Sequence, residues 1–166
     1  MDAEDERRFR AWAAARAGRL HRTAYLLCGD WHVAEDLVQE ALTSAALHWR
    51  RMERMGNPDA YVRRILINQI GQHWRRRSTH ERPANALPEA VVGDGSRERA
   101  ARDELLTALR SLPPRQRAAV VLRYFDQLSE IETAEALDCS VGTVKSSTSR
   151  ALATLRRVLS TQEIPC

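Results

Sequence analysis

The stretch LSEIETAEALDCSVGTVKSSTSRALATLRRVL, residues 128–159, carries the most specific pattern in this chain of 166 residues. Ser129 and Glu132 have the spacing of a capping box, which predicts that a short helix begins there. Residues 138–140 form a tight turn, and its aspartate tolerates the left-handed backbone that such turns often need. The serine of this turn can cap a longer basic helix over 141–159. Two helices joined by a three-residue turn predict a helix-turn-helix.

The second helix of this motif has an apolar face and a polar face. Val144, Ala151 and Leu155 recur with helical spacing and can pack inward. In a helix-turn-helix the second helix enters the major groove of DNA, where side chains contact bases and phosphates. The residues left outward or along the rim are Thr143, Lys145, Ser146, Ser149 and Arg150. Plain helical bundles contain similar helix pairs, so the pattern favours DNA binding without excluding a structural role.

The remainder of the chain also predicts helices, so the expected fold class is all-α. Apolar residues recur with helical spacing over 4–27, 31–49, 58–77, 96–111 and 114–125. Asp30 and Asn57 precede two of these segments and are expected to cap them. Residues 50–57 are expected to form a loop, and Phe125 is expected to face inward.

Residues 79–100 differ in composition from the segments on either side, because they hold two prolines and two glycines and show little periodicity. This predicts a flexible linker between two small helical domains, residues 1–78 and 101–160. Each domain has a basic segment. Residues 49–78 hold eight arginines against two acids, and residues 141–159 hold four basic residues and no acid. Clustered arginine suits polyanions because its planar guanidinium can bind phosphate through two hydrogen bonds, although a solvated helix face is the ordinary alternative.

The arginine-rich helix of the first domain has a polar arc. At about 100° per residue, Arg64, Asn68, Gly71 and Arg75 fall opposite the apolar stripe, with Gln72 beside them. Cations with an amide suit a nucleic acid, but periodicity alone explains the arc equally well as solvent-exposed surface.

Several classes of protein are disfavoured. The chain has no apolar run of about 18 residues and no apolar stretch behind its charged N-terminus, which predicts a cytoplasmic protein without membrane insertion. Cys28, Cys139 and Cys166 are far apart and odd in number, which predicts reduced thiols rather than a zinc site. The sequence has no glycine-rich phosphate loop, no clustered carboxylates and no hydrolase motif. We therefore expect no enzyme activity, no metal site and no cofactor.

Four segments resemble, in the same order, the extracytoplasmic-function (group IV) sigma factors of the sigma-70 family. They are GDWHVAEDLVQEAL (29–42), NPDAYVRRILINQIGQHWRRR (57–77), LPPRQRAAVVLRYFDQLSEIETA (112–134) and AEALDCSVGTVKSSTSRALATLR (134–156). The AYVRRILIN segment is similar to that of actinobacterial members of the sigma-E type. The chain departs from many members at Ser147, where they have arginine, and at Gln127 and Asp138, where they have glycine.

The resemblance implies a sigma factor, which brings core RNA polymerase to specific promoters and promotes strand opening. Domain 2 of such a protein contacts the β′ clamp coiled coil, and the matching residues are Glu35, Asp36, Gln39 and Glu40. The first two of these were also expected in the first turn of their helix, where the helix dipole alone would favour acids. The other partners implied are the polymerase β flap, promoter DNA and an anti-sigma factor.

Two sets of residues are implied for DNA. For the minus-ten element, where the family captures a base flipped from the non-template strand, they are Arg54, Asn57, Arg63, Arg64, Asn68, Gln72, Trp74, Arg75 and Arg76. For the minus-thirty-five element they are Arg123, Thr143, Lys145, Ser146, Ser149 and Arg150. Core packing is an equally good interpretation of Trp74.

The linker bears on how both elements are bound. A flexible linker of this length spans roughly 25 Å on average and about 75 Å when stretched. Promoter elements about 17 base pairs apart are separated by roughly 58 Å. Binding both elements therefore needs a scaffold that holds the linker extended, and core polymerase would be that scaffold. The alternative is a regulator that binds DNA through its helix-turn-helix without polymerase, which would need a dimer interface that the sequence does not offer.

Overall fold

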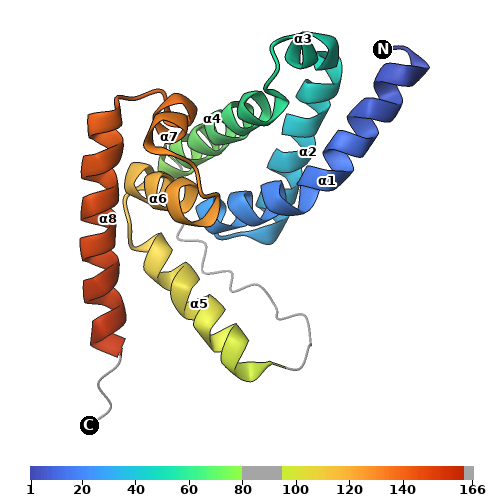
Figure 1. Ribbon diagram of the computed structural model, residues 1–166. Coiled ribbons are helices and arrows are strands. Elements are labelled where there is room, and N and C mark those ends of the chain that lie inside the picture. Colours follow the sequence, from blue (N-terminus) through green and yellow to red (C-terminus); the bar gives the residue numbers. More distant parts are fainter. Residues whose placement is uncertain (80–94, 163–166) are drawn as a thin grey trace.

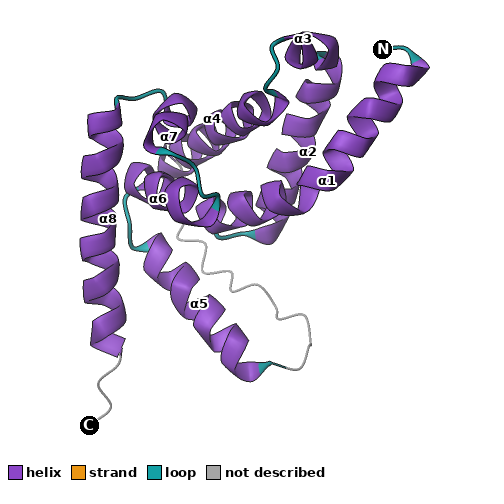
Figure 2. Ribbon diagram, in the orientation of Figure 1, coloured by secondary structure: helices purple, strands orange, loops and turns teal. Residues whose placement is uncertain are grey.

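The computed structural model describes residues 1–79 and 95–162, and within these ranges every regular element is a helix (Figure 2). The first half (residues 1–79) and the second half (residues 95–162) each form a group of helices. The elements are α1 (Ala3–Cys28), α2 (Trp31–Leu47), α3 (Trp49–Arg54), α4 (Pro58–Thr79), α5 (Ser96–Arg110), α6 (Pro114–Val120), the π-helical turn η1 (Val121–Phe125), α7 (Glu130–Leu137) and α8 (Val141–Gln162). No described helix is both long enough and apolar enough to cross a membrane.

The helix caps expected from the sequence are confirmed. The side-chain oxygens of Asp30, Asn57 and Ser140 each accept a hydrogen bond from the backbone N–H three residues on, at 3.1 Å. Ser129 and Glu132 form both bonds of the capping box that begins α7. These bonds satisfy backbone donors that the first turn of a helix leaves unpaired.

Two expectations about local structure were wrong. Residues expected to form a loop after Trp49 instead form α3, because Trp49 and Met52 lie on one face and are both buried. Phe125 is 41% exposed, because the π-helical turn η1 adds a residue per turn and rotates the following side chains. α5 begins at Ser96, where the helical spacing predicts a helix, so its first residues overlap the predicted linker; residues 80–94 of that linker lie outside the described ranges.

The first half is organised around three helices. The buried faces of α1, α2 and α4 meet in a core that includes Leu27, Val38 and Leu66. α3 closes one end of this group, and the loop from α3 to α4 lies at that end (Figure 1). In the second half, α8 packs along α6 and α7, with Val144 and Ala151 on its buried face.

The two halves pack against each other. α4 lies beside α7, and the C-terminal end of α1 contacts η1, α5 and α6 (Figure 1). One continuous apolar cluster contains Leu27 and Ile70 of the first half together with Leu109 and Val121 of the second. A second cluster joins Ile67 of α4 to buried residues of η1 and α7. The described parts of the chain therefore form one closed body.

Candidate nucleic-acid interface

The polar arc on α4 is present as the periodicity predicts. Val62, Leu66 and Ile70 are buried on one side of the helix, and Arg64 and Asn68 are exposed on the other. Further along the same helix, Gln72, Arg75 and Arg76 are exposed, whereas Trp74 is half-buried. The arc therefore presents cations and amides to solvent, and these are side chains that can bind phosphates and base edges.

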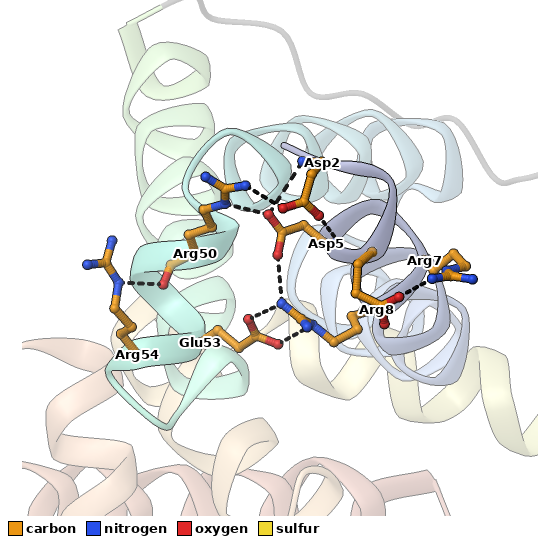
Figure 3. Close-up of polar contacts among 8 residues, drawn as sticks. Asp2, Asp5, Arg7, Arg8, Arg50, Glu53 and Arg54 are labelled. Carbon is orange, nitrogen blue, oxygen red and sulfur yellow. Dashed lines mark hydrogen bonds and ion pairs between the residues drawn. The ribbon is translucent and has the colours of Figure 1, made fainter.

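An ion-pair network fastens the segment that leads into this arc (Figure 3). The side chain of Asp5 is 6% exposed. It accepts hydrogen bonds from Nε of Arg50 and from Nη2 of Arg8, the latter at 2.6 Å. Arg8 also pairs with Glu53 at 2.9 Å, and Arg50 pairs with Asp2 at 2.7 Å. The N-terminus of α1 is thus tied to α3.

The C-terminal end of α3 lies next to this network and leads into the loop before α4. Arg54, the last residue of α3, donates from Nε to the carbonyl of Arg50 at 3.2 Å (Figure 3). Asn57, which caps α4, is exposed in the loop that follows. Because α3 is fixed at both its charged face and its buried face, the loop leaves it in a defined direction.

The second basic surface is formed by α8. Asp138 adopts the left-handed backbone expected of the turn, with φ 51° and ψ 53°. This sends α8 away from α7 and leaves Lys145, Ser146 and Ser149 exposed near its start. Lys145 pairs with Glu130 of α7 at 3.7 Å. The N-terminal part of α8 therefore presents hydroxyls and cations outward, as a reading helix requires.

Two residues of the predicted minus-thirty-five set are less available than the rest. Thr143 is half-buried, and its hydroxyl lies 2.9 Å from that of Ser140. Arg123 is half-buried in η1 and donates to the carbonyl of Leu128. Arg150, by contrast, is exposed. The set is therefore centred on the exposed face of α8, with Arg123 at its edge.

The sequence alone allowed either core packing or a contact with DNA for Trp74. It packs against the apolar cluster, and the guanidinium carbon of Arg117 lies 5.3 Å from the centre of its ring. This arrangement supports packing as its role in the closed body. Its predicted contact with DNA stays a prediction.

An acidic surface lies on α2, opposite the buried stripe of that helix. Its members are Glu35, Asp36, Gln39 and Glu40, all of them exposed. Within the described residues none of these side chains makes a hydrogen bond or an ion pair. The helix begins at Trp31 and its first turn contains no acid, so the expectation that Glu35 and Asp36 lie in the first turn was wrong. A favourable interaction with the helix dipole in the first turn therefore does not explain why Glu35 and Asp36 are acidic.

Sequence reasoning missed the residues that join the two halves. Asp126 is buried beside α1, accepts a hydrogen bond from Thr23 at 2.6 Å and lies 3.8 Å from Nε of Arg19. Burial raises the pKa of the Asp126 carboxyl above its ordinary value, while Thr23 and the nearby Arg19, Arg63 and Arg22 act to lower it. No local pattern identifies this site, because its partners lie about a hundred residues apart in the chain.

Comparison with known proteins accounts for both halves. Residues 14–80 match the family described as Sigma-70 region 2, and residues 102–155 match Sigma-70, region 4. The chain belongs to the sigma-70 family. The RNA polymerase sigma-E factor of Streptomyces coelicolor is 40% identical to it over 156 residues, which are 94% of this chain and 88% of that protein.

Other relatives place it in the extracytoplasmic-function group of sigma factors. The ECF RNA polymerase sigma factor SigE of Mycolicibacterium smegmatis is 35% identical over 152 residues, covering 86% of this chain and 58% of that protein. Among solved structures, the complex of the sigma factor RpoE with the anti-sigma factor NepR from Bartonella quintana matches with a TM-score of 0.75 and 26% identity, over 92% of this chain and 96% of that one. The chain is therefore an RNA polymerase sigma factor of this group.

Proposed function

We propose that this sigma factor binds core RNA polymerase through the acidic surface of α2 and reads promoters through two separate basic surfaces. The observation that carries the first part is the position of Glu35, Asp36, Gln39 and Glu40 on one exposed face without partners in the described chain. An exposed acidic face with an amide suits a basic helical partner, and the β′ clamp coiled coil is that partner in the resemblance.

The two basic surfaces divide the promoter between them. The polar arc of α4 and the preceding loop bind the minus-ten element, where Asn68 faces an extruded base and the arginines hold phosphates. The exposed face of α8 binds the minus-thirty-five element in the major groove, with the second half held on the β flap. The proposed domains are residues 1–78 and 101–160, and the family matches over residues 14–80 and 102–155 support this division.

The setting of this function is also a proposal. We place the protein in the cytoplasm with reduced thiols and without enzyme activity, cofactor or metal. Burial raises the pKa of the Cys28 thiol to about 12, which supports an unreactive role for that residue. An anti-sigma factor is a further proposed partner, supported by the likeness to a sigma factor solved with NepR.

Docking is tested by the double variant Gln39→Ala, Glu40→Arg. Both side chains are exposed on α2, so we expect unchanged helix content and at least roughly tenfold weaker competition against another sigma factor for limiting core polymerase. The matched control is Thr43→Ala, which removes an exposed side chain one turn along the helix and should compete normally. Normal competition by the double variant would place the polymerase interface elsewhere.

A further inference from the structure

The loop between α3 and α4 is short, and it precedes the helix that carries the polar arc (Figure 1). It runs from Met55, which is 64% exposed, to Asn57, which is also exposed. Gly56 has a φ of 75°, and a side chain added at this residue would meet nothing within 4 Å. A loop this short follows the two helices that it joins, so its position depends on how α3 and α4 are held.

An aromatic contact holds the α3 side of the loop. The ring centres of Trp12 on α1 and Trp49, the first residue of α3, are 5.5 Å apart, with the ring planes at 48°. The ring of Phe9, one turn earlier on α1, contacts Trp49 edge to face at 5.5 Å. Ring pairs at these distances are favourable, and Trp49 is only 4% exposed. The first residue of α3 is therefore packed firmly against α1.

The same indole holds the α4 side of the loop. Nε1 of Trp12 donates a hydrogen bond to the carboxylate of Asp59, in the first turn of α4, at 2.9 Å. Nε of Arg16, one turn further along α1, donates to the same carboxylate oxygen. The guanidinium carbon of Arg16 also lies 5.3 Å from the centre of the Trp12 ring. Hydrogen bonds to a carboxylate are stronger than those between neutral groups, so the start of α4 is fixed to α1.

Trp12 thus contacts both of the helices that the loop connects, through its ring on one side and its N–H on the other. Ordinary packing does not require the second contact: Nε1 of the neighbouring Trp49 is buried and makes no hydrogen bond within the described chain. The helix dipole alone would favour an acid at Asp59, but that effect requires no donor from α1. The hydrogen bond between Trp12 and Asp59 therefore adds a specific constraint on where the loop ends.

We infer that Trp12 and Asp59 are positioning residues for the minus-ten base pocket, and that the hydrogen bond between them helps to set which base is accepted. This rests on the proposed assignment of the loop and of Asn68 to an extruded base. Groups that recognise a ligand have to be held within about 0.5 Å of the productive geometry by the side chains behind them. Discrimination between bases depends on such geometry, so loss of this bond relaxes the choice of base without removing any contact with DNA.

Three variants test the bond. Trp12→Phe keeps a ring beside Trp49 and removes the N–H, Asp59→Ala removes the acceptor, and Asp59→Asn retains an oxygen acceptor. Holoenzyme complexes that resist heparin are captured from copies of one promoter with randomised minus-ten bases, and the bound DNA is sequenced. We expect the ratio of the favoured base to the next to fall at least roughly threefold in the first two variants. Asp59→Asn should stay close to the parent.

Two controls separate positioning from charge and from stability. Asp103→Ala removes an exposed carboxylate from α5 and should keep the base preference of the parent. Leu106→Val reduces a side chain of α5 that is 4% exposed, so it lowers the melting temperature without touching α1, α3 or α4. Its base preference should also be parental. Competition for core polymerase should be unchanged in every variant, because none alters the acidic surface of α2.

A second measurement follows the loop itself, without polymerase or DNA. Residues 54–61 include backbone amides that donate hydrogen bonds, among them those of Gly56, Ala60 and Tyr61. Hydrogen exchange of the free protein, measured by mass spectrometry over this peptide, reports how often the loop opens. We expect at least roughly threefold faster exchange in Trp12→Phe and Asp59→Ala, and parental exchange over the same peptide in Leu106→Val.

The possible failures point to different causes. Parental exchange over 54–61 in Trp12→Phe and Asp59→Ala, or a base preference that falls no further than in Leu106→Val, would overturn the inference. A parent holoenzyme that shows no preference at any randomised base would instead count against the proposed function, because it would remove the minus-ten assignment on which the inference rests.

Discussion

Asn68 occupies a position that packing does not explain. Its side chain is exposed in the middle of α4 and makes no hydrogen bond within the described chain. Alanine would stabilise a helix interior by about 0.5 kcal/mol relative to asparagine. We therefore expect Asn68→Ala to fold at least as stably as the parent, to form closed promoter complexes with core polymerase, and to open them several-fold less. Permanganate footprinting on a supercoiled promoter measures the opening step.

A premelted template separates base capture from other defects. When the bubble is already open, less unpairing has to be driven by the pocket, so the Asn68→Ala protein should recover part of its activity. Wild-type opening of duplex promoters by this variant would rule out a role for Asn68 in base capture.

The backbone conformation of single residues could be predicted only in part from the sequence. Asp138 was expected to be left-handed and is so, with φ 51°. Gln127 also has a positive φ, 56°, although no feature of glutamine itself indicates it. Both stand where the resemblance has glycine in many members, so the backbone shape is set by the fold and the side chain is accommodated.

At the scale of single elements, α3 depends on a carboxylate that belongs to another helix. Asp5→Asn leaves the guanidinium groups of Arg8 and Arg50 without their shared partner. Both arginines are about half-exposed, so the expected loss is about 1 kcal/mol, or a melting temperature about 2–4 °C lower. Because α3 leads into the loop before α4, promoter opening should fall while binding to core polymerase is kept.

Thermal unfolding followed by circular dichroism measures the first effect. The matched control is Glu6→Gln, which breaks only an exposed pair with Arg10 on the same helix and should change the melting temperature very little. An Asp5→Asn protein that melts and opens promoters like its control would show that α3 needs no fastening to α1.

Helices that have a capping residue and a regular apolar spacing were predicted well. Features that depend on residues far away in the chain were not. The caps at Asp30, Asn57 and Ser129 were visible because each acts on the next three residues. α3 was missed because a run of charges obscured the spacing of its two buried side chains. The exposed arcs of α4 and α8 followed from helical periodicity. The ion pair between Arg64 on α4 and Asp138 at the end of α7, 3.8 Å apart, could not be predicted. Helical periodicity shows which face of a helix is polar, but not which helices pack against each other.

At the scale of the whole molecule, closure is coupled to the protonation of Asp126. Its pKa is raised in the closed body, chiefly by burial, and would return to its ordinary value once the halves separate. Protonation therefore favours closure: the stabilisation is present at low pH and is lost as pH rises through the raised pKa. The nearby guanidinium groups of Arg19, Arg22 and Arg63 act in the opposite direction and lower the pKa of this carboxyl.

We expect Asp126→Asn to be more stable than the parent at neutral pH, because asparagine stays neutral in this buried position. The stability of the parent should rise toward that of the variant as pH falls from 7 to about 5, and the stability of the variant should change less. Glu132 does not reverse this trend, since its pKa is lowered chiefly by the Ser129 backbone in a cap within α7. Thermal unfolding across this pH range measures the effect, and parallel profiles for the two proteins would contradict the coupling.

The apolar cluster shared by the two halves links the sigma factor's conformation to its survival in the cell. Separation uncovers side chains such as Leu27, Ile67 and Val121, and exposed apolar surface of this kind invites aggregation and proteolytic cleavage. The closed chain protects these side chains by itself, and a chain spread on polymerase has them next to a large partner. A chain that is open and alone has neither protection. Turnover should therefore remove the molecules that have opened without finding polymerase, and the amount of polymerase would help to set how long each copy lasts.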